Sequence, residues 1–101
     1  MTKAAYRFRV PNDAALLIRG LHPELKQKVR TSLALLGHDP HAGKALQAEL
    51  EGLYSLRAGR LRIIYRPGGR RSIEIVAIGP RERVYEETLR LLRKDPERKR
   101  K

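Results

Sequence analysis

Three arginines and one tyrosine are the residues of this chain whose types and spacing could do chemistry on a phosphate. Arg57 and Arg62 stand on either side of Gly59 and Arg60, in two runs that alternate apolar and polar residues. Alternation predicts β-strands, and a Gly-X pair between two such runs predicts a tight hairpin turn. Folded about that turn, the hairpin sets Arg57 directly opposite Arg62.

The opposite face of the same hairpin is apolar. Its register sets Leu56 opposite Ile63 and Tyr54 opposite Tyr65. A slip of one residue would turn every one of these side chains to the other face, so the pattern specifies the register. The hairpin is therefore expected to offer one face to a core and the other to solvent or a ligand.

Two opposed arginines need an explanation, because like charges that face each other across a sheet destabilise it. One explanation is that both side chains are solvated on an open face. The other is that Arg57 and Arg62 bind one anion, most simply a phosphate, which guanidinium groups bind in bidentate geometry. The hairpin geometry alone favours neither explanation.

Arg81 and Tyr85 follow the next predicted strand. That strand ends at Gly79 and Pro80, and Arg81 comes next, at the approach to a predicted helix. Residues four apart share one face of a helix, so Arg81 and Tyr85 point the same way. The end of the strand is expected to deliver both side chains near the edge of the sheet that carries the opposed arginines.

The third strand joins the hairpin through a second turn. A loop of Gly68, Gly69 and Arg70 is a common three-residue hairpin type. It puts alternate residues of the third strand on the apolar face of the hairpin, namely Ile73, Ile75 and Ala77. Val76 and Ile78 are apolar as well, which predicts a strand that is covered on both faces.

A strand and a helical hairpin are predicted before this meander. Residues 5–10 alternate and predict the strand. A short helix over residues 13–19, with Asn12 as its N-cap, ends at Gly20. A second helix begins at residues 22–24 and ends at Gly37. The two helices are expected to cover the apolar face of the sheet.

The remaining segments complete a single α+β domain over residues 1–93. Residues 43–52 form a connector with a short helical turn, and residues 82–93 form a last helix. The predicted buried side of that helix consists of Val84, Thr88, Leu91 and Leu92. Residues 94–101 are charged and lack apolar side chains, which predicts a basic, flexible tail.

The composition points to a polyanionic partner. The 101 residues carry a formal net charge of +12, most of it outside the tail. Such an excess favours nucleic acid, an acidic protein or an anionic membrane surface over a merely solvated surface. There is no cysteine, no apolar run long enough for a membrane span and no signal peptide, so we expect a cytoplasmic protein without a membrane partner.

No metal or cofactor is expected. His38 and His41 are three residues apart, but Pro40 between them breaks the helix that would align them. The preferred interpretation is a solvated loop.

Three segments carry a resemblance to a known family, in this order and at these spacings. They are residues 46–57, which end in ELEGLYSLR; residues 59–65, GRLRIIY; and residues 78–85, which contain IGPR and VY. Together with the order of elements, they resemble the RelE/ParE superfamily of bacterial toxins from type II toxin–antitoxin pairs. The resemblance implies an N-terminal strand, a two-helix hairpin, an antiparallel three-stranded meander and a C-terminal helix.

The RelE-like branch is favoured, and it implies cleavage of mRNA on the ribosome by attack of a 2′-hydroxyl on the adjacent phosphate. Arg57, Arg62, Arg81 and Tyr85 match the family's catalytic side chains. Arginines stabilise the negative charge of the transition state, but they stay protonated, so Tyr85 is the candidate for proton transfer. The implied phosphate-binding set is Arg57, Arg60, Arg62, Arg81 and Arg83.

Two alternatives stay open. ParE-like members use the same scaffold to poison DNA gyrase and also keep arginines that resemble Arg57 and Arg62. The chain also departs from the RNases, which carry lysines on the strand where this chain has Leu53, Ser55 and Arg57.

A non-catalytic module that binds RNA or protein is the other alternative. Either toxin implies a cognate antitoxin with an acidic, partly disordered segment that folds on the basic surface.

Overall fold

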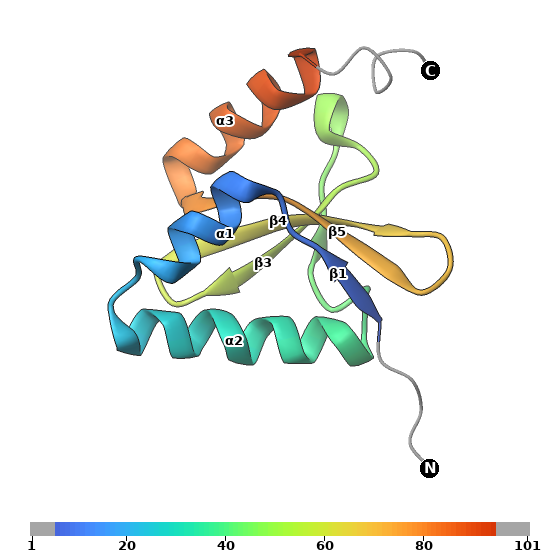
Figure 1. Cartoon of the computed structure of the whole chain (residues 1–101). Helices are drawn as coiled ribbons and strands as arrows, with labels where there is room; N and C mark the ends of the chain where they lie inside the picture. Colours follow the sequence, from blue (N-terminus) through green and yellow to red (C-terminus); the bar gives the residue numbers. More distant parts are fainter. Residues whose placement is uncertain (1–5, 95–101) are drawn as a thin grey trace.

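The computed structural model of the chain describes residues 6–94, which form a five-stranded sheet with helices on both faces. Figure 1 shows α2 on one side of the sheet and α3 on the other. Along the chain the elements are β1 (Arg7–Arg9), α1 (Asn12–Arg19), α2 (Pro23–His38), β2 (Lys44–Ala45), the 3-10 helix η1 (Ala48–Leu50), β3 (Tyr54–Ala58), β4 (Leu61–Gly68), β5 (Ser72–Pro80) and α3 (Arg81–Lys94).

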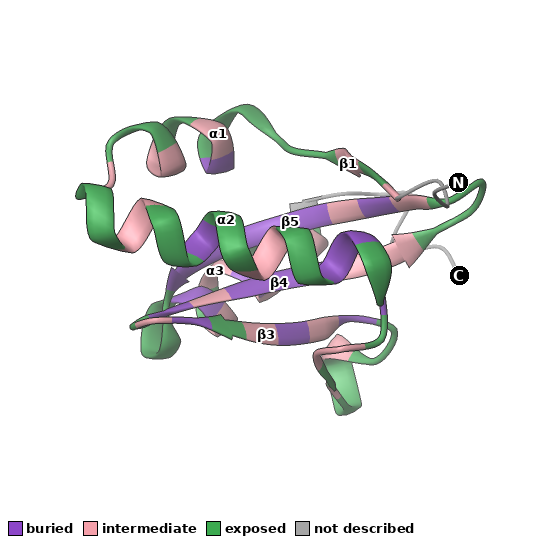
Figure 2. Ribbon diagram, turned by 90° about the horizontal axis from the view of Figure 1, so that it is seen from below, coloured by how far each residue is buried: buried purple, intermediate pink, exposed green. Residues whose placement is uncertain are grey.

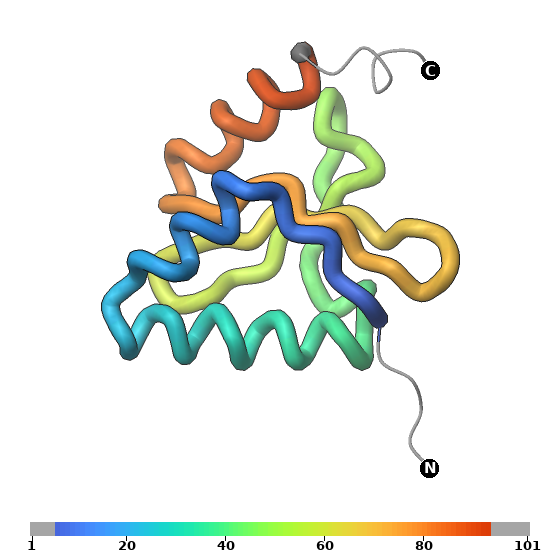
Figure 3. Tube along the Cα trace, viewed as in Figure 1, coloured from blue at the N-terminus to red at the C-terminus, as the bar shows by residue number. Residues whose placement is uncertain are grey.

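The sheet has the strand order β1-β5-β4-β3-β2. The three long strands are antiparallel neighbours, whereas β1 is parallel to β5 and lies at the edge. Figure 3 shows the N-terminal strand beside β5, although the two are far apart in sequence. The architecture confirms the predicted α+β class with its helical hairpin, three-stranded meander and C-terminal helix.

The register of the first hairpin is confirmed. Arg57 pairs with Arg62, and Leu56 pairs with Ile63. The turn between them has Gly59 at a φ of 66°, a left-handed conformation that glycine adopts without steric cost. The sequence pattern and the turn chemistry agree here, which is why the register could be predicted.

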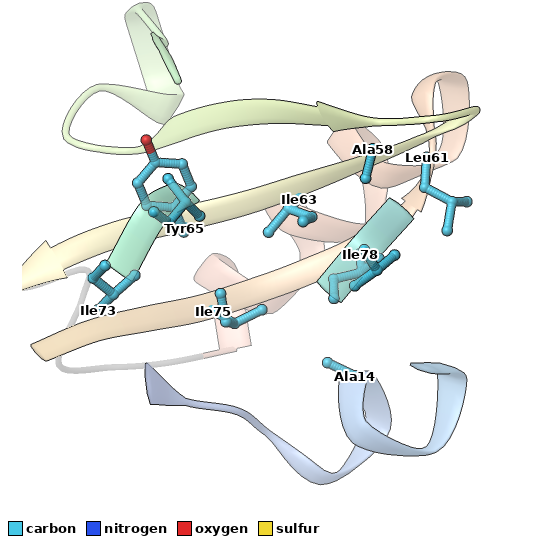
Figure 4. Packing of buried hydrophobic residues seen from close by; sticks show 10 residues of the cluster. Ala14, Ala58, Leu61, Ile63, Tyr65, Ile73, Ile75 and Ile78 are labelled. Atoms are coloured by element: carbon cyan, nitrogen blue, oxygen red, sulfur yellow. The ribbon is translucent and has the colours of Figure 1, made fainter. Parts of the chain in front are cut away.

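The larger core lies between the sheet and the α1–α2 hairpin. Figure 4 shows its side chains converging from β3, β4 and β5 toward the helices. Val29 and Leu36 of α2 are fully buried, and Ala14 of α1 is nearly so. The buried sheet residues of this cluster are Ala58, Leu61, Ile63, Tyr65, Ile73, Ile75 and Ile78. The predicted role of the helical hairpin as a cover for the apolar face is thus confirmed.

Tyr65 joins this core to the loop after α2. Its ring stacks on that of Tyr54 with centroids 5.5 Å apart, and its hydroxyl accepts a hydrogen bond of 2.9 Å from the Gly43 N–H. Burial raises the pKa of the Tyr65 hydroxyl above its ordinary value of 10.0, and the bond from Gly43 partly offsets that effect. The Tyr65 hydroxyl is therefore neutral, and its hydrogen bond with Gly43 holds the loop after α2 against the sheet.

The second hairpin differs from the prediction. Gly68 pairs with Ser72, so the loop is Gly69–Arg71, not Gly68–Arg70, and the register shifts between Ile64 and Tyr65. This β-bulge sends Ala77 to the opposite face of the sheet, against the prediction. A bulge inserts one extra residue and reverses the alternation beyond it.

The helices also need corrections. Pro11, not Asn12, precedes the first helical residue, and no side chain caps that end. Leu91 is exposed rather than buried, whereas Val84 and Thr88 are buried as predicted. His22 caps α2 by accepting a hydrogen bond from the Glu24 N–H at 3.4 Å. The helix begins at Pro23, directly after His22, so the predicted start of α2 is confirmed.

Several predicted bounds change. The helix α2 continues to His38, one residue beyond Gly37, and β1 is shorter than the predicted strand. Residues 43–52 contain the predicted helical turn as η1, but also the unpredicted strand β2. The predicted flexible tail covers residues 94–101, but Lys94 is the last residue of α3. Residues 95–101 lie outside the described residues, as do residues 1–5. Within residues 6–94, none of the helices is long and apolar enough to cross a bilayer.

Candidate functional site

The face of the sheet opposite the α1–α2 hairpin carries the candidate functional residues. Because side chains alternate along β3, Ser55 and Arg57 point away from the face of Tyr54 and Leu56. Arg62 of β4 points to the same side. The helix α3 covers part of this face through a smaller core of Leu53, Ile64, Val76, Ala77 and Val84.

Ser55 is the centre of the polar contacts on this face. Its Oγ accepts a hydrogen bond of 3.2 Å from the Tyr85 hydroxyl and one of 3.4 Å from Arg62 Nη1. Only 2% of Ser55 is exposed, so the serine is fixed by its surroundings. It thereby holds a side chain of α3 and a side chain of β4 together.

Arg57 is opposite Arg62, but its side chain turns away. Arg57 is exposed and its Nε donates a hydrogen bond of 3.3 Å to the Gly59 carbonyl. The two guanidinium groups are thus held by different acceptors, Gly59 and Ser55. This arrangement relieves the repulsion between like charges that their backbone pairing creates.

Arg81 and Arg83 begin the helix that follows β5 directly. Arg62 pairs with Gly79 across the sheet, so Arg81 stands two residues beyond a partner of Arg62. Both Arg81 and Arg83 are exposed in the first turn of α3. Positive side chains at a helix N-terminus oppose the helix dipole, whereas an anion there is stabilised by it. The arrangement favours the approach of a phosphate to this end of the sheet.

Arg66 lies further along the same face and has an acidic partner. Its guanidinium group forms an ion pair with Glu74 of β5. Arg66 is therefore not part of the candidate site, whose arginines lie at the end of the sheet that carries Arg57, Arg62 and Arg81.

Arg60 lies apart from this group. It is exposed at the turn between β3 and β4, beside the first turns of α2, where it lines a shallow hollow with His22, Glu24 and Lys28. The structure thus brings Arg62 and Tyr85 together, sets Arg57 and Arg81 at the same end of the sheet, and directs Arg60 toward the opposite layer.

The residue that sequence reasoning missed is Ser55 as a link between Arg62 and Tyr85. Its position on β3 shows which face it occupies, and that signal was available. The contact itself depends on how α3 packs over the sheet, which the sequence pattern does not specify.

The chain offers no metal centre in the part that the structure describes. No group of three His, Cys, Asp or Glu side chains within residues 6–94 could hold a metal ion. In the loop after α2, Asp39 Oδ1 accepts a hydrogen bond of 3.1 Å from the His41 N–H, which makes Asp39 a turn-forming residue.

Comparison with known proteins identifies the family. A family model described as the ParE toxin of the type II toxin–antitoxin system parDE matches residues 13–85. The chain belongs to this toxin family. That membership confirms the predicted place in the RelE/ParE superfamily, and the protein is a type II toxin–antitoxin toxin. No curated protein sequence matches the chain.

Solved toxin structures share the fold. A chain of the RelBE2 toxin–antitoxin complex from Mycobacterium tuberculosis is 26% identical over 75% of this chain and 98% of that chain, with a TM-score of 0.65. A mutant of the E. coli toxin RelE in the free state is 19% identical over 85% and 96% of the two chains, with a TM-score of 0.68. A chain of the archaeal RelE–RelB complex from Pyrococcus horikoshii OT3 is 20% identical over 79% and 99%, with a TM-score of 0.63.

Proposed function

We propose that this toxin is a ribosome-dependent mRNA endoribonuclease that inhibits translation. The observation that carries the proposal is the contact of Tyr85 and Arg62 with Ser55 at the basic end of the sheet. It combines a hydroxyl that can exchange a proton with a guanidinium that can bind a phosphate oxygen.

The reaction needs charge stabilisation and one proton transfer. Attack of the 2′-hydroxyl forms a bond from O2′ to phosphorus and breaks the bond to O5′, which leaves a 2′,3′-cyclic phosphate and a 5′-hydroxyl. In sum, one proton moves from O2′ to O5′. Arg57, Arg62 and Arg81 stabilise the negative charge that develops on the nonbridging oxygens, and Tyr85 takes part in the proton transfer.

Ser55 has a supporting part in this scheme. A serine hydroxyl cannot act as the cationic acid that a lysine provides, so Ser55 positions its neighbours instead. It orients Tyr85 and Arg62 before the substrate arrives, which lowers the cost of assembling the site.

The proposed partners follow from the basic surface. A cognate antitoxin with an acidic segment would cover the arginines and block access of RNA. Two of the similar solved structures are complexes of a toxin with its antitoxin, which supports a partner of this kind. Ribosome and mRNA are the proposed targets.

A gyrase poison is the second candidate, because the matching family model is that of ParE toxins. On this alternative the same arginines bind a protein or DNA surface, and Tyr85 needs no proton-transfer role. A binding module without chemistry would use the basic face in a similar way.

Induction in a bacterial host separates these functions. The protein would be expressed while RNA 5′ ends, translation and DNA damage are followed, with Tyr85→Phe as the matched variant. Codon-phased cuts in translated messages that disappear in Tyr85→Phe support the RNase. Intact messages with arrested replication support the gyrase poison, and normal growth with a folded protein supports the binding module.

A further inference from the structure

The tip of the β4–β5 hairpin has an unusual backbone for the residues that form it. Arg70 and Arg71 both have a φ of 57°, in the left-handed region. Side chains with a Cβ disfavour this conformation, and glycine or asparagine is the ordinary choice there. Two successive arginines at such positions indicate that their side chains matter at the tip.

The tip is held in place by several contacts. Ser72 Oγ donates a hydrogen bond of 2.8 Å to the Gly69 carbonyl. The Arg7 N–H of β1 donates one of 2.8 Å to the Arg71 carbonyl. The Arg71 guanidinium lies 5.3 Å from the centre of the Tyr6 ring, a cation–π contact. The arginines are therefore presented by a fixed loop.

Four arginines gather at this place, and we call them the hairpin-tip surface. Arg7 and Arg9 of β1 pair with Ser72 and Glu74 of β5, so they lie beside the tip residues. All four members are exposed, and Figure 2 shows the loop of the hairpin as exposed along its length. The members are Arg7, Arg9, Arg70 and Arg71.

This surface is separate from the candidate site. Arg62 and Gly69 are seven residues apart along an extended strand, which corresponds to about 23 Å at roughly 3.3 Å per residue. Figure 1 shows the β4–β5 loop at the opposite end of the sheet from the start of α3. One phosphate cannot contact both places, whereas a long polyanion can.

We propose that the hairpin-tip surface binds the phosphate backbone of folded RNA, as a second contact that positions the toxin on its target. The choice of RNA as the polyanion rests on the proposed function. Guanidinium groups bind phosphate oxygens in bidentate geometry, and backbone contacts of this kind fix orientation without reading sequence.

The surface suits a phosphate backbone better than a protein. Protein interfaces have an apolar core. The large apolar side chains exposed within residues 6–94 are Val10, Leu16, Leu35 and Leu91, and none of them belongs to the tip. The tip offers cations and glycines, and the aromatic ring of Tyr6 lies against the Arg71 guanidinium.

A binding measurement on RNA that cannot be cleaved tests this proposal. Fluorescence anisotropy would follow the full-length toxin on a labelled RNA duplex with 2′-O-methyl groups, which remove the attacking hydroxyl. The variant Arg70→Gly/Arg71→Gly removes two charges, and glycine accepts the backbone conformation, so the fold is retained. We expect affinity to fall about tenfold or more, and the slope of log K against log salt to decrease by about 1 to 2.

The control is Arg19→Gln/Arg30→Gln, which removes the same charge from exposed positions on α1 and α2. Retained affinity in the control with loss at the tip supports the proposal. Equal losses in both variants overturn it, because general charge then explains binding. The proposal is also overturned if the tip variant binds RNA normally but no longer binds a polyglutamate peptide. That result would favour an acidic protein as the partner of the hairpin-tip surface.

The result separates this proposal from the proposed function. If the chain cuts mRNA on ribosomes but the tip variant binds the duplex normally, only the hairpin-tip proposal fails. If no mRNA is cut and the tip variant still loses duplex binding, the surface stands and the RNase assignment fails.

Discussion

The Tyr85 hydroxyl lies 3.2 Å from Ser55 Oγ, and this hydrogen bond joins the helix α3 to a buried serine of strand β3. Arg62 Nη1 shares the same acceptor at 3.4 Å. Tyr85 of α3 and Arg62 of β4 therefore donate to the same acceptor, and a substitution of Ser55 should displace both side chains.

The variant Ser55→Ala should lose most of the proposed RNase activity and keep the fold. Alanine removes the acceptor, and displacement of a catalytic group by about 1 Å can lower a rate about 100-fold. Loss of the hydrogen bonds should lower the free energy of unfolding by about 1 kcal/mol. Cleavage on purified ribosomes and urea unfolding measure the two effects.

Ser32→Ala is the matched control for that variant. Ser32 Oγ donates a hydrogen bond of 3.2 Å to the Arg57 carbonyl from the other side of the sheet. The same chemical change there should leave cleavage unchanged. Normal activity of Ser55→Ala would show that Ser55 does not position Tyr85 or Arg62.

The variant Arg81→Ala should abolish toxicity with little effect on stability. Arg81 is exposed at the start of α3, and exposed substitutions shift stability by about 0.5 kcal/mol or less. Removal of one donor to a developing oxyanion lowers kcat about 100-fold to 1000-fold. Growth after induction and thermal unfolding check both parts, with Arg19→Ala, which changes an exposed arginine of α1, as the control. Full toxicity of the folded Arg81→Ala protein would remove Arg81 from the site.

Gly43→Ala should destabilise the protein. A Cβ at Gly43 would lie 2.7 Å from the Tyr65 hydroxyl and 2.8 Å from the Ser55 carbonyl, both closer than van der Waals contact. Overpacking of this kind costs about 1–3 kcal/mol. Gly69→Ala is the control, because nothing lies within 4 Å of a Cβ there. Urea unfolding curves compare the two, and equal midpoints would contradict the packing at Gly43.

Stability should fall at alkaline pH because of Tyr65. Its pKa is raised in the folded protein by burial, so the folded state holds the proton more strongly than the unfolded state does. This contribution is fully present below the unfolded pKa of about 10 and is lost as the pH rises through the higher folded pKa. Unfolding free energies measured across this range should fall less steeply for Tyr65→Phe than for the wild type. If the free energy of unfolding depends on pH in the same way for the wild type and Tyr65→Phe, then Tyr65 ionises as easily in the folded state as in the unfolded state.

The sequence predicted the β3–β4 hairpin in full because two independent signals agreed. Alternation placed Leu56 opposite Ile63, and Gly59 supplied the turn. It could not predict the bulge near Tyr65, since Ile63 and Ile64 are both apolar and both faces of β5 are buried. Where both faces of a strand are apolar, the pattern of apolar and polar residues no longer specifies to which face each side chain points.

The candidate site was predictable residue by residue but not as a set of contacts. The positions of Arg57 and Arg62 followed from the hairpin. The separate acceptors Gly59 and Ser55, and the bond from Tyr85, depend on rotamers and on the angle of α3 over the sheet. The strand β2 escaped prediction because it has two residues, which is too short for an alternating pattern to be recognised.

Cleavage of mRNA on purified, programmed ribosomes tests the central claim most directly. The message would carry a single 2′-deoxynucleotide at the cut position in one sample and the natural nucleotide in the other. We predict a cut with a 2′,3′-cyclic phosphate end in the natural message, none in the deoxy message, and a loss of about 100-fold or more in rate for Tyr85→Phe. An uncut natural message, or a normal rate for Tyr85→Phe, would contradict the account.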